Sequence, residues 1–381
     1  MVRAAFIVER ADDKWCCVVD LGRADGKRKR KTIYGRTRKE VAEKLKAVLR
    51  DQQQGLPIAV ERQTVGQFLD RWLTEVARPT LRDSTYASYR SKIALYLLPT
   101  LGATQLLALT PQHVQAMMTA MRERGLSPRS VQYARAILRK ALNQALKWGL
   151  VARNVAVLTD APRVERPDIR PLDPIGAARL LAAVRGDRLE ALYTVALALG
   201  LRQGEALGLR WQDVDLQAGV LHVRVALQRL PNELPRLVEP KTRQSRRSLP
   251  LPGVVAAQLH DHRARQQAER EHAGAAWPED DCDLIFTTAR GVPMSAVTLT
   301  KQFKRHLAAT GLPDMRFHDL RHSCASLLVA QGVHPRVVME ILGHSTIALT
   351  MNTYSHILPA AQRQAADAMD RLLVAQIAPE I

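Results

Sequence analysis

The sequence has few cysteines and no long apolar run. Only four cysteines occur in 381 residues; Cys16 and Cys17 are adjacent, and Cys282 and Cys324 stand far apart. Adjacent cysteines suit no ordinary disulfide, and no CxxC pair suggests zinc, so we expect a reducing compartment. No apolar run approaches the roughly 20 residues that span a bilayer, and the first residues do not have the pattern of a signal peptide. These absences predict a cytoplasmic protein with no membrane partner.

Acidic residues are scarce relative to basic ones. The sequence contains 37 Asp and Glu residues and 56 Lys and Arg residues, which gives a formal net charge of +19. Such an excess predicts a polyanionic partner, most often nucleic acid, although a merely basic protein from an arginine-rich genome stays possible. The chain is 46% hydrophobic, enough for real cores, and its length predicts two or three domains.

Three segments follow one another along the chain. Residues 1–55 combine the β-prone runs KWCCVVDLG and KRKTIYG with a helix that begins after Thr37 and has Glu40 at the capping-box position. Residues 63–155 have the spacing of amphipathic helices. A proline-rich linker, APRVERPDIRPLDP, then precedes residues 172–381, which mix helices with the strand-like runs GVLHVRVALQ and SRRSLPLP. The expected fold class is mainly α with small β regions (α+β).

Capping residues mark the helices of the second segment. Thr64, Asp83, Thr110 and Ser127 each stand where a helix is expected to begin, and the last two are followed by proline. The final helix of this bundle is expected to bury an apolar stripe. Its members are Val131, Ile137, Leu138, Leu142 and Leu146.

Two groups of basic residues are candidate contacts for DNA phosphates. One lies in the hairpin region of the first segment and consists of Lys27, Arg28, Lys29, Arg30 and Lys31. The other lies along the last helix of the bundle and consists of Arg129, Arg135, Arg139 and Lys140. Solvation of a turn or of a helix face would explain either group equally simply.

The stretch FHDLRHSCASLL, from Phe317 to Leu328, has two competing interpretations. His318 and His322 would share a helical face next to Asp319, as in a zinc-protease helix. Arg321 lies on the same face and stays protonated, so its charge opposes a bound cation. The pattern therefore favours an anion site over a metal site. A serine hydrolase built on Ser323 is also conceivable, but no GxSxG elbow occurs.

Other polar residues of the third segment add to this anion site. Arg202 and Glu205 are spaced i, i+3 in GLRQGEALGLRWQDVDL, so they can touch. The full set comprises two arginines, a lysine, two histidines and a tyrosine, namely Arg202, Arg321, Lys241, His318, His344 and Tyr354. Arginines can clamp phosphate oxygens, a tyrosine can attack phosphorus, and a lysine can protonate the leaving alkoxide. This inventory suits attack on a phosphodiester without metal or ATP.

These motifs, with PKTRQSRRSLPLP and LGHSTIALTMNTYSH, resemble those of the tyrosine recombinase (phage integrase) family. The resemblance covers the whole third segment, as the catalytic domain. The helical segment resembles the family's SAM-like core-binding domain, and the first segment its arm-type DNA-binding domain. Gln203 stands where many relatives have arginine, at a position outside the reacting set.

The resemblance implies a role for each residue of the set. Arg202 and Arg321 would clamp the scissile phosphate, His318 would assist as base or hydrogen-bond partner, and His344 would hold a phosphate oxygen. Lys241 would protonate the leaving 5′ oxygen, and Tyr354 would form a 3′-phosphotyrosyl bond. Glu205 would orient the site. No cofactor and no metal would be needed.

The family resemblance further implies a homotetramer on double-stranded DNA with core-type and arm-type sites. It would act in a bacterial host, integrating or excising a phage or mobile element, with a possible accessory directionality or DNA-bending protein. The amphipathic C-terminal tail with Met369, Leu372 and Leu373 would pack on its own chain or on a neighbour. Two alternatives stay open at this point: a type IB topoisomerase-like enzyme and a noncatalytic DNA-binding regulator.

Overall fold

The computed structural model describes most of the chain outside the C-terminal segment. The described residues are 7–9, 15–24, 27–53, 63–165, 170–231, 233–240, 245–278, 282–343, 366–367, 369–370 and 373. The chain divides into two compact units, Met1–Arg166 and Pro167–Ile381. Among the described helices, none combines the length and the apolar character needed to cross a bilayer.

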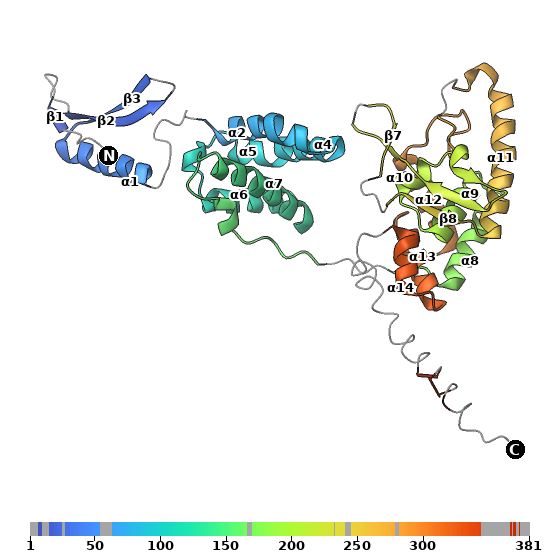
Figure 1. The fold of residues 1–381 in the computed structure, drawn as a ribbon. Helices are drawn as coiled ribbons and strands as arrows, with labels where there is room; N and C mark the ends of the chain where they lie inside the picture. The colour runs from blue at the N-terminus through green and yellow to red at the C-terminus, as the bar shows by residue number, and fades with distance from the viewer. Residues whose placement is uncertain are drawn as a thin grey trace. The chain divides into compact units, whose positions relative to one another are not determined.

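The N-terminal segment is a small antiparallel sheet covered by one helix (Figure 1). Strands β1 (Ile7–Glu9), β2 (Trp15–Ala24) and β3 (Lys27–Gly35) pair in that order, and α1 (Arg38–Gln53) follows. Alternate residues of the sheet bury Cys17, Val19 and Ile33 against Val41 of the helix, which gives the module its own core. The Thr37 hydroxyl accepts from the Glu40 amide as predicted, but the Glu40 carboxylate accepts from the Arg36 amide instead of completing the capping box.

The second segment is a helical bundle. Its helical elements are α2 (Val65–Trp72), η1 (Leu73–Ala77), α3 (Arg78–Thr80), α4 (Asp83–Lys92), η2 (Ile93–Leu97), α5 (Leu98–Leu101), η3 (Leu106–Ala108), α6 (Pro111–Glu123), α7 (Pro128–Lys147) and η4 (Val155–Leu158). Thr64, Thr110 and Ser127 cap their helices through side-chain oxygens, which confirms the predicted starts. Two one-turn π-helices, η1 and η2, interrupt what the sequence predicted as continuous helices.

One predicted core position in the bundle is wrong. Leu146 of α7 is 43% exposed, whereas Ala145 beside it is fully buried. The buried stripe of α7 contains Ala134, Leu138 and Ala141, spaced at four and three residues, and Leu146 lies one position around the helix from that stripe.

The second unit mixes helices with two small sheets. Its helical elements are α8 (Pro174–Ala183), α9 (Glu190–Leu199), α10 (Gln203–Leu207), η5 (Trp211–Asp213), α11 (Gly253–Ala273), η7 (Gly274–Ala276), α12 (Ala296–Thr310), α13 (Asp319–Ala330) and α14 (Pro335–Leu342). Its strands are β4 (Val214–Asp215), β5 (Val220–Val223), β6 (Ala226–Gln228), β7 (Arg236–Val238) and β8 (Arg247–Pro250). The sheet orders are β4-β5-β8 and β6-β7, so the run predicted as one strand, GVLHVRVALQ, forms β5 and β6 in different sheets.

Helix α9 lies at the centre of this unit. Its residues are apolar on all sides, and α8, α11 and α13 pack against it. A helix that is hydrophobic all round is stable only when other elements cover it. This burial fixes the position of its C-terminal end, where Gly200 follows.

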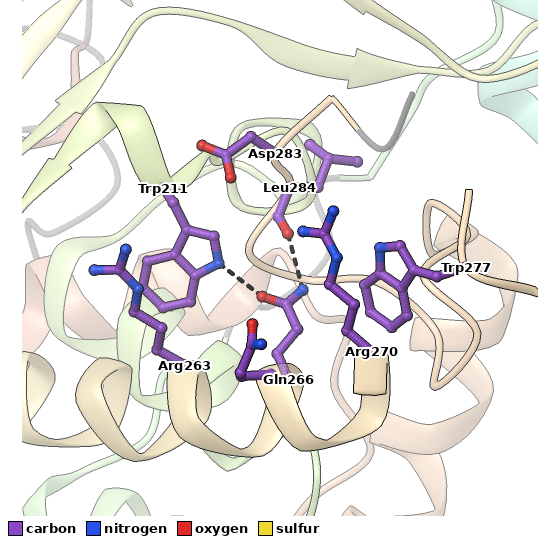
Figure 2. Close-up of a pocket in the computed structure, with 8 residues that line it drawn as sticks. Trp211, Arg263, Gln266, Arg270, Trp277, Asp283 and Leu284 are labelled. Carbon is purple, nitrogen blue, oxygen red and sulfur yellow. Dashed lines mark hydrogen bonds between the residues drawn. The ribbon is translucent and has the colours of Figure 1, made fainter. Parts of the chain in front are cut away.

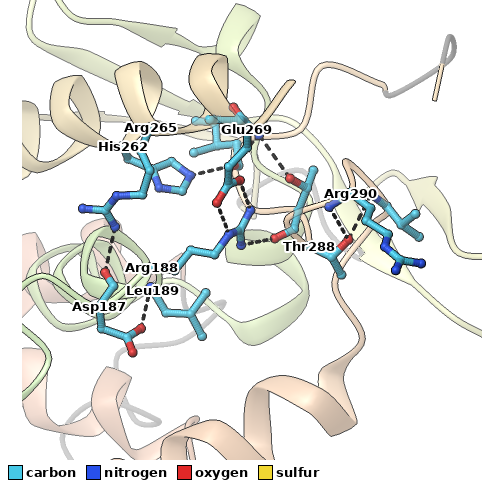
Figure 3. A network of polar contacts seen from close by, with 12 residues as sticks. Asp187, Arg188, Leu189, His262, Arg265, Glu269, Thr288 and Arg290 are labelled. Atoms are coloured by element: carbon cyan, nitrogen blue, oxygen red, sulfur yellow. Dashed lines mark hydrogen bonds and ion pairs between the residues drawn. The ribbon is translucent and has the colours of Figure 1, made fainter. Parts of the chain in front are cut away.

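Polar contacts hold α11 against the loops on one side of the unit. In Figure 2, Gln266 accepts from the Trp211 indole at 2.7 Å and donates to the Leu284 carbonyl at 3.0 Å, beside a cavity of about 130 Å³. Arg188 donates two hydrogen bonds of 2.6 Å to the Glu269 carboxylate, as Figure 3 shows. It also donates to the Thr287 carbonyl. These contacts connect α11 to the start of α9 and to the chain that precedes α12.

Candidate active site

The backbone between α9 and α10 is shaped by a glycine. Gly200 adopts a left-handed conformation with φ of 60° and ends α9. A Cβ at this position would lie 2.5 Å from Leu342 Cδ2 and 3.2 Å from Cys324 Sγ. Only glycine combines that backbone with so close an approach. The ends of α9 and α14 are therefore in direct contact with α13 at this point.

Arg202 lies at the N-cap of α10 and contacts two segments. Its Nη1 donates to Glu205 Oε1 at 2.5 Å, which confirms the predicted i, i+3 pair. Its Nη2 donates to the Gly343 carbonyl at 3.0 Å. The side chain is still 37% exposed, so the guanidinium remains accessible to a ligand. Gly343 immediately precedes His344 in the sequence, so Arg202 contacts the segment that leads to the predicted phosphate ligand.

The Glu205 carboxylate is only 4% exposed and is shared by two arginines. Arg247, the first residue of β8, donates from Nη2 to Glu205 Oε2 at 3.0 Å. Burial alone would raise the pKa of Glu205, but Arg247 and Arg202 outweigh it and hold the pKa below its usual range. Glu205 is therefore an anion paired with both arginines.

Helix α13 supplies the histidine and the second arginine. Arg321 is 2% exposed, and its Nη1 donates to the Gly200 carbonyl at 2.8 Å. That carbonyl is two residues before Arg202, so the two predicted clamp arginines come from segments in direct contact. His318 is the N-cap of α13, and its ring centroid lies 5.4 Å from that of His322.

The surroundings of His318 lower its pKa, mainly through loss of hydration. Loss of hydration, together with the neighbouring His322 ring and the Arg321 charge, lowers the pKa of His318 to about 4. A neutral imidazole can accept a proton or a hydrogen bond, which is the chemistry that the resemblance assigns to this position.

Ser323 has a structural contact and is fully buried. Its hydroxyl donates to the Asp319 carbonyl at 3.0 Å and accepts from the Leu172 amide at 2.9 Å. It ties α13 to the beginning of the second unit and does not face a substrate. The hydrolase alternative based on this serine therefore has no support.

Three predicted catalytic residues lie outside the described residues: Lys241, His344 and Tyr354. The described chain reaches the residue before two of them, since Pro240 precedes Lys241 and Gly343 precedes His344. The described part of the site unites Arg202, Glu205 and Arg321 from α10 and α13.

The predicted DNA contacts have different surroundings. Of the five basic residues in β3, the side chain of Arg30 is described, and it is exposed. On α7, Arg129, Arg139 and Lys140 are exposed. Arg135 instead donates to the Thr159 hydroxyl and carbonyl, so its guanidinium is engaged within the bundle.

Arg247 is a residue of this site that was not predicted from the sequence. Its side chain is 7% exposed and binds Glu205 together with two backbone carbonyls. Strand alternation places it on the same face as the buried Leu249. An arginine on the buried face of a strand needs an acidic or carbonyl partner, and that signal could have indicated it.

Comparison with known proteins places the chain in a family. Residues 172–360 match the phage integrase family, and residues 64–121 match the N-terminal SAM-like domain of phage integrases. An integrase of Streptomyces ambofaciens is 32% identical over 92% of this chain and 91% of its own. A XerC-like tyrosine recombinase of Caldanaerobacter subterraneus is 29% identical over 98% of this chain and 100% of its own.

Solved structures show the same fold. The Tn1549 transposon integrase in complex with a circular intermediate DNA has a TM-score of 0.69 at 23% identity, covering 81% of this chain and 99% of that one. A lambda integrase tetramer bound to a Holliday junction has a TM-score of 0.57 at 20% identity, covering 89% of this chain and 95% of that one. The chain belongs to the phage integrase family of tyrosine recombinases. It is a site-specific DNA recombinase, and the mainly helical fold predicted from the sequence is confirmed.

Proposed function

We propose that the chain cuts and rejoins DNA through a covalent bond to Tyr354. The observation that carries this proposal is the convergence of Arg202 and Arg321. Arg321 binds the Gly200 carbonyl and Arg202 binds the Gly343 carbonyl, next to His344. Glu205 pairs with Arg202, and the two guanidinium groups supply the positive field that a phosphodiester requires.

In the proposed reaction the Tyr354 oxygen attacks phosphorus and its proton passes to a base, for which neutral His318 is suited. The bond from phosphorus to the 5′ oxygen breaks, and Lys241 gives that oxygen a proton. The product is a 3′-phosphotyrosyl bond and a free 5′ hydroxyl. Attack by the 5′ hydroxyl of another strand reverses the sequence, so the phosphodiester energy is conserved without ATP. Arg202, Arg321 and His344 stabilise the charge that develops on the nonbridging oxygens.

In the proposed assembly, each protomer acts on double-stranded DNA through three domains. Residues 172–381 carry the reaction, residues 63–155 bind core sites with the basic face of α7, and residues 1–55 bind arm-type sites. The lambda integrase tetramer on a Holliday junction supports four protomers exchanging strands in pairs. The four cysteines are free thiols, which supports a bacterial cytoplasm as the site of action. An accessory directionality or DNA-bending protein would set the choice between integration and excision.

The proposal is tested with purified protein and DNA that flanks its own gene, nicked next to the crossover so that cleavage traps the adduct. We expect the unsubstituted protein to form a covalent adduct, and Tyr354→Phe to bind the same DNA without forming one. Tyr193→Phe is the matched control, because Tyr193 is the other tyrosine of the second unit and is fully buried. It should form the adduct normally.

Two outcomes would overturn the proposal. Absence of an adduct with the unsubstituted protein would favour a noncatalytic regulator. Relaxation of supercoiled plasmids without site preference would favour a type IB topoisomerase.

A further inference from the structure

Arg247 is a buried charge that the proposed reaction does not use. It begins β8 and points to the inner face of the sheet, where its side chain is 7% exposed. Its Nε donates to the Ile341 carbonyl at 2.6 Å, Nη1 to the Ser245 carbonyl at 3.1 Å and Nη2 to Glu205 at 3.0 Å. The guanidinium thus joins three segments, namely the start of β8, helix α10 and the end of α14.

The contacts of Arg247 and Arg202 form a closed ring. Arg202 binds Glu205 Oε1 and the Gly343 carbonyl; Arg247 binds Glu205 Oε2 and the Ile341 carbonyl. Ile341 and Gly343 are two residues apart at the end of α14. Each arginine therefore touches the same carboxylate and the same turn of backbone. Displacement of one member of the ring shifts the others.

Glu205 divides its charge between the two arginines. If Arg247 were absent, the buried carboxylate would have Arg202 as its remaining charged partner. Arg202, which already contacts Glu205, would then neutralise that carboxylate without Arg247, and less of its charge would be available to an incoming phosphate. The Arg202 side chain is partly exposed and accessible to a ligand. The Arg247 side chain is buried and donates to three acceptors.

We propose that Arg247 is a positioning residue of the recombinase site, which acts through Glu205 to hold Arg202 in the geometry that grips the scissile phosphate. This inference rests on the proposed role of Arg202. Arg247 itself touches no substrate. Its bond to the Ile341 carbonyl additionally fixes the end of α14, from which the chain continues to His344. The lowered pKa of Glu205 supports the arrangement, since Arg247 contributes the larger share of the opposing charge.

A positioning role and a merely structural role predict different couplings. The bonds to Ile341 and Ser245 stabilise the fold whether or not Glu205 is charged. The effect on Arg202 requires the Glu205 carboxylate. A double-mutant cycle of Arg247→Met and Glu205→Gln separates the two effects. For each variant, the rate of single-turnover cleavage of the nicked site and the melting temperature are measured.

We expect each single substitution to slow cleavage at saturating DNA by about 10²-fold, because a small misplacement of a clamp costs that much. The Kd for DNA should change by less than about threefold, since phosphate contacts across the whole site dominate binding. The cleavage rate of the double variant should lie within about threefold of the rate of the slower single variant. Arg247→Lys, which keeps the charge, should recover part of the cleavage rate.

Arg246→Met is the matched control. Arg246 adjoins Arg247, is exposed and pairs with the exposed Glu239 at 2.5 Å. Its cleavage rate should equal that of the unsubstituted protein. If Arg247→Met does not fold, as judged by circular dichroism, the cycle is run with Arg247→Lys instead.

Independent effects, which multiply to a loss of about 10⁴-fold in the double variant, would overturn the positioning role. Normal cleavage by Arg247→Met with a lowered melting temperature would also overturn it and leave a purely structural arginine. A failure of the proposed function is distinct from both outcomes, because the unsubstituted protein would then form no adduct.

Discussion

The left-handed backbone at Gly200 turns the chain out of α9 and toward Arg202. Gly200→Ala should destabilise the protein by roughly 2–4 kcal/mol, because the new methyl combines left-handed strain with overpacking against Leu342. Urea denaturation measures the loss. Gly219→Ala is the control: Gly219 has φ of 64° and open space around it, so only the strain of about 1 kcal/mol remains. Equal losses for the two variants would show that the contact with Leu342 is unimportant.

The lowered pKa of His318 predicts how the stability of the catalytic unit changes with pH. Its pKa in the folded state is lowered, so the unfolded chain, with a histidine pKa near about 6.5, binds the proton more readily. The contribution of neutral His318 to stability is therefore present above about pH 6.5 and is lost as the pH falls toward its folded pKa. Part of the residue remains exposed, so solvent screens the neighbouring charges and the loss of stability is small.

The test compares unfolding free energies at pH 7 and pH 5. We expect the unsubstituted protein to lose more stability on acidification than His318→Gln, which lacks the titrating group. His260→Gln, at an exposed position on α11, should behave like the unsubstituted protein. Identical pH slopes for the unsubstituted protein and His318→Gln would contradict the assignment.

Single residues were predictable where the sequence spacing is local. The Arg202–Glu205 pair and the His318–His322 neighbours follow from helical geometry and are present. The bond from Arg321 to the Gly200 carbonyl was not predictable, because it joins positions 121 residues apart in the sequence. Arg247 was missed for the same reason.

Among the elements, α11 is attached in part by a half-buried ion pair between Arg188 and Glu269. Arg188→Met would leave Glu269 without its bidentate partner and remove a bond to Thr287, as Figure 3 shows. We expect a loss of about 2–3 kcal/mol in the free energy of unfolding. Thermal or urea denaturation measures it. Arg336→Met, which removes an exposed i, i+4 pair with Glu340, should cost less than about 0.5 kcal/mol. Similar costs for both would argue against the importance of burial.

Helix starts were more predictable than strand limits. A cap is a local signal, so Thr64, Thr110 and Ser127 could be assigned from the residues that follow them. The division of GVLHVRVALQ into β5 and β6 depends on their partners β8 and β7, which lie later in the chain. The exposure of Leu146 likewise depends on which face of α7 the rest of the bundle covers. Such outcomes are set by tertiary packing.

At the scale of the whole molecule, the basic strand β3 predicts salt-dependent DNA binding. Replacing Lys27 through Lys31 with glutamine should weaken binding to arm-type DNA and reduce the slope of log K against log salt, because fewer counterions are released. Fluorescence anisotropy over a salt series measures both quantities. Glutamine at Lys39 and Lys46, two exposed lysines of α1, removes charge from the helix of the same module and should change the slope less. An unchanged slope for the β3 variant would reject the arm-binding assignment.

The charge balance and the motifs were sufficient to predict the family and a mainly helical fold. The tail was predicted as an amphipathic helix; Met369 and Leu373, its described apolar members, are exposed, and Leu372 lies outside the described residues.

The most direct test of the central claim is to identify the atom that joins protein to DNA. The adduct formed on a nicked site is digested with nuclease and protease, and the modified peptide is sequenced by mass spectrometry. The account predicts a nucleotide linked through its 3′ phosphate to Tyr354. A nucleotide on any other residue, or DNA that remains bound only noncovalently, would contradict it.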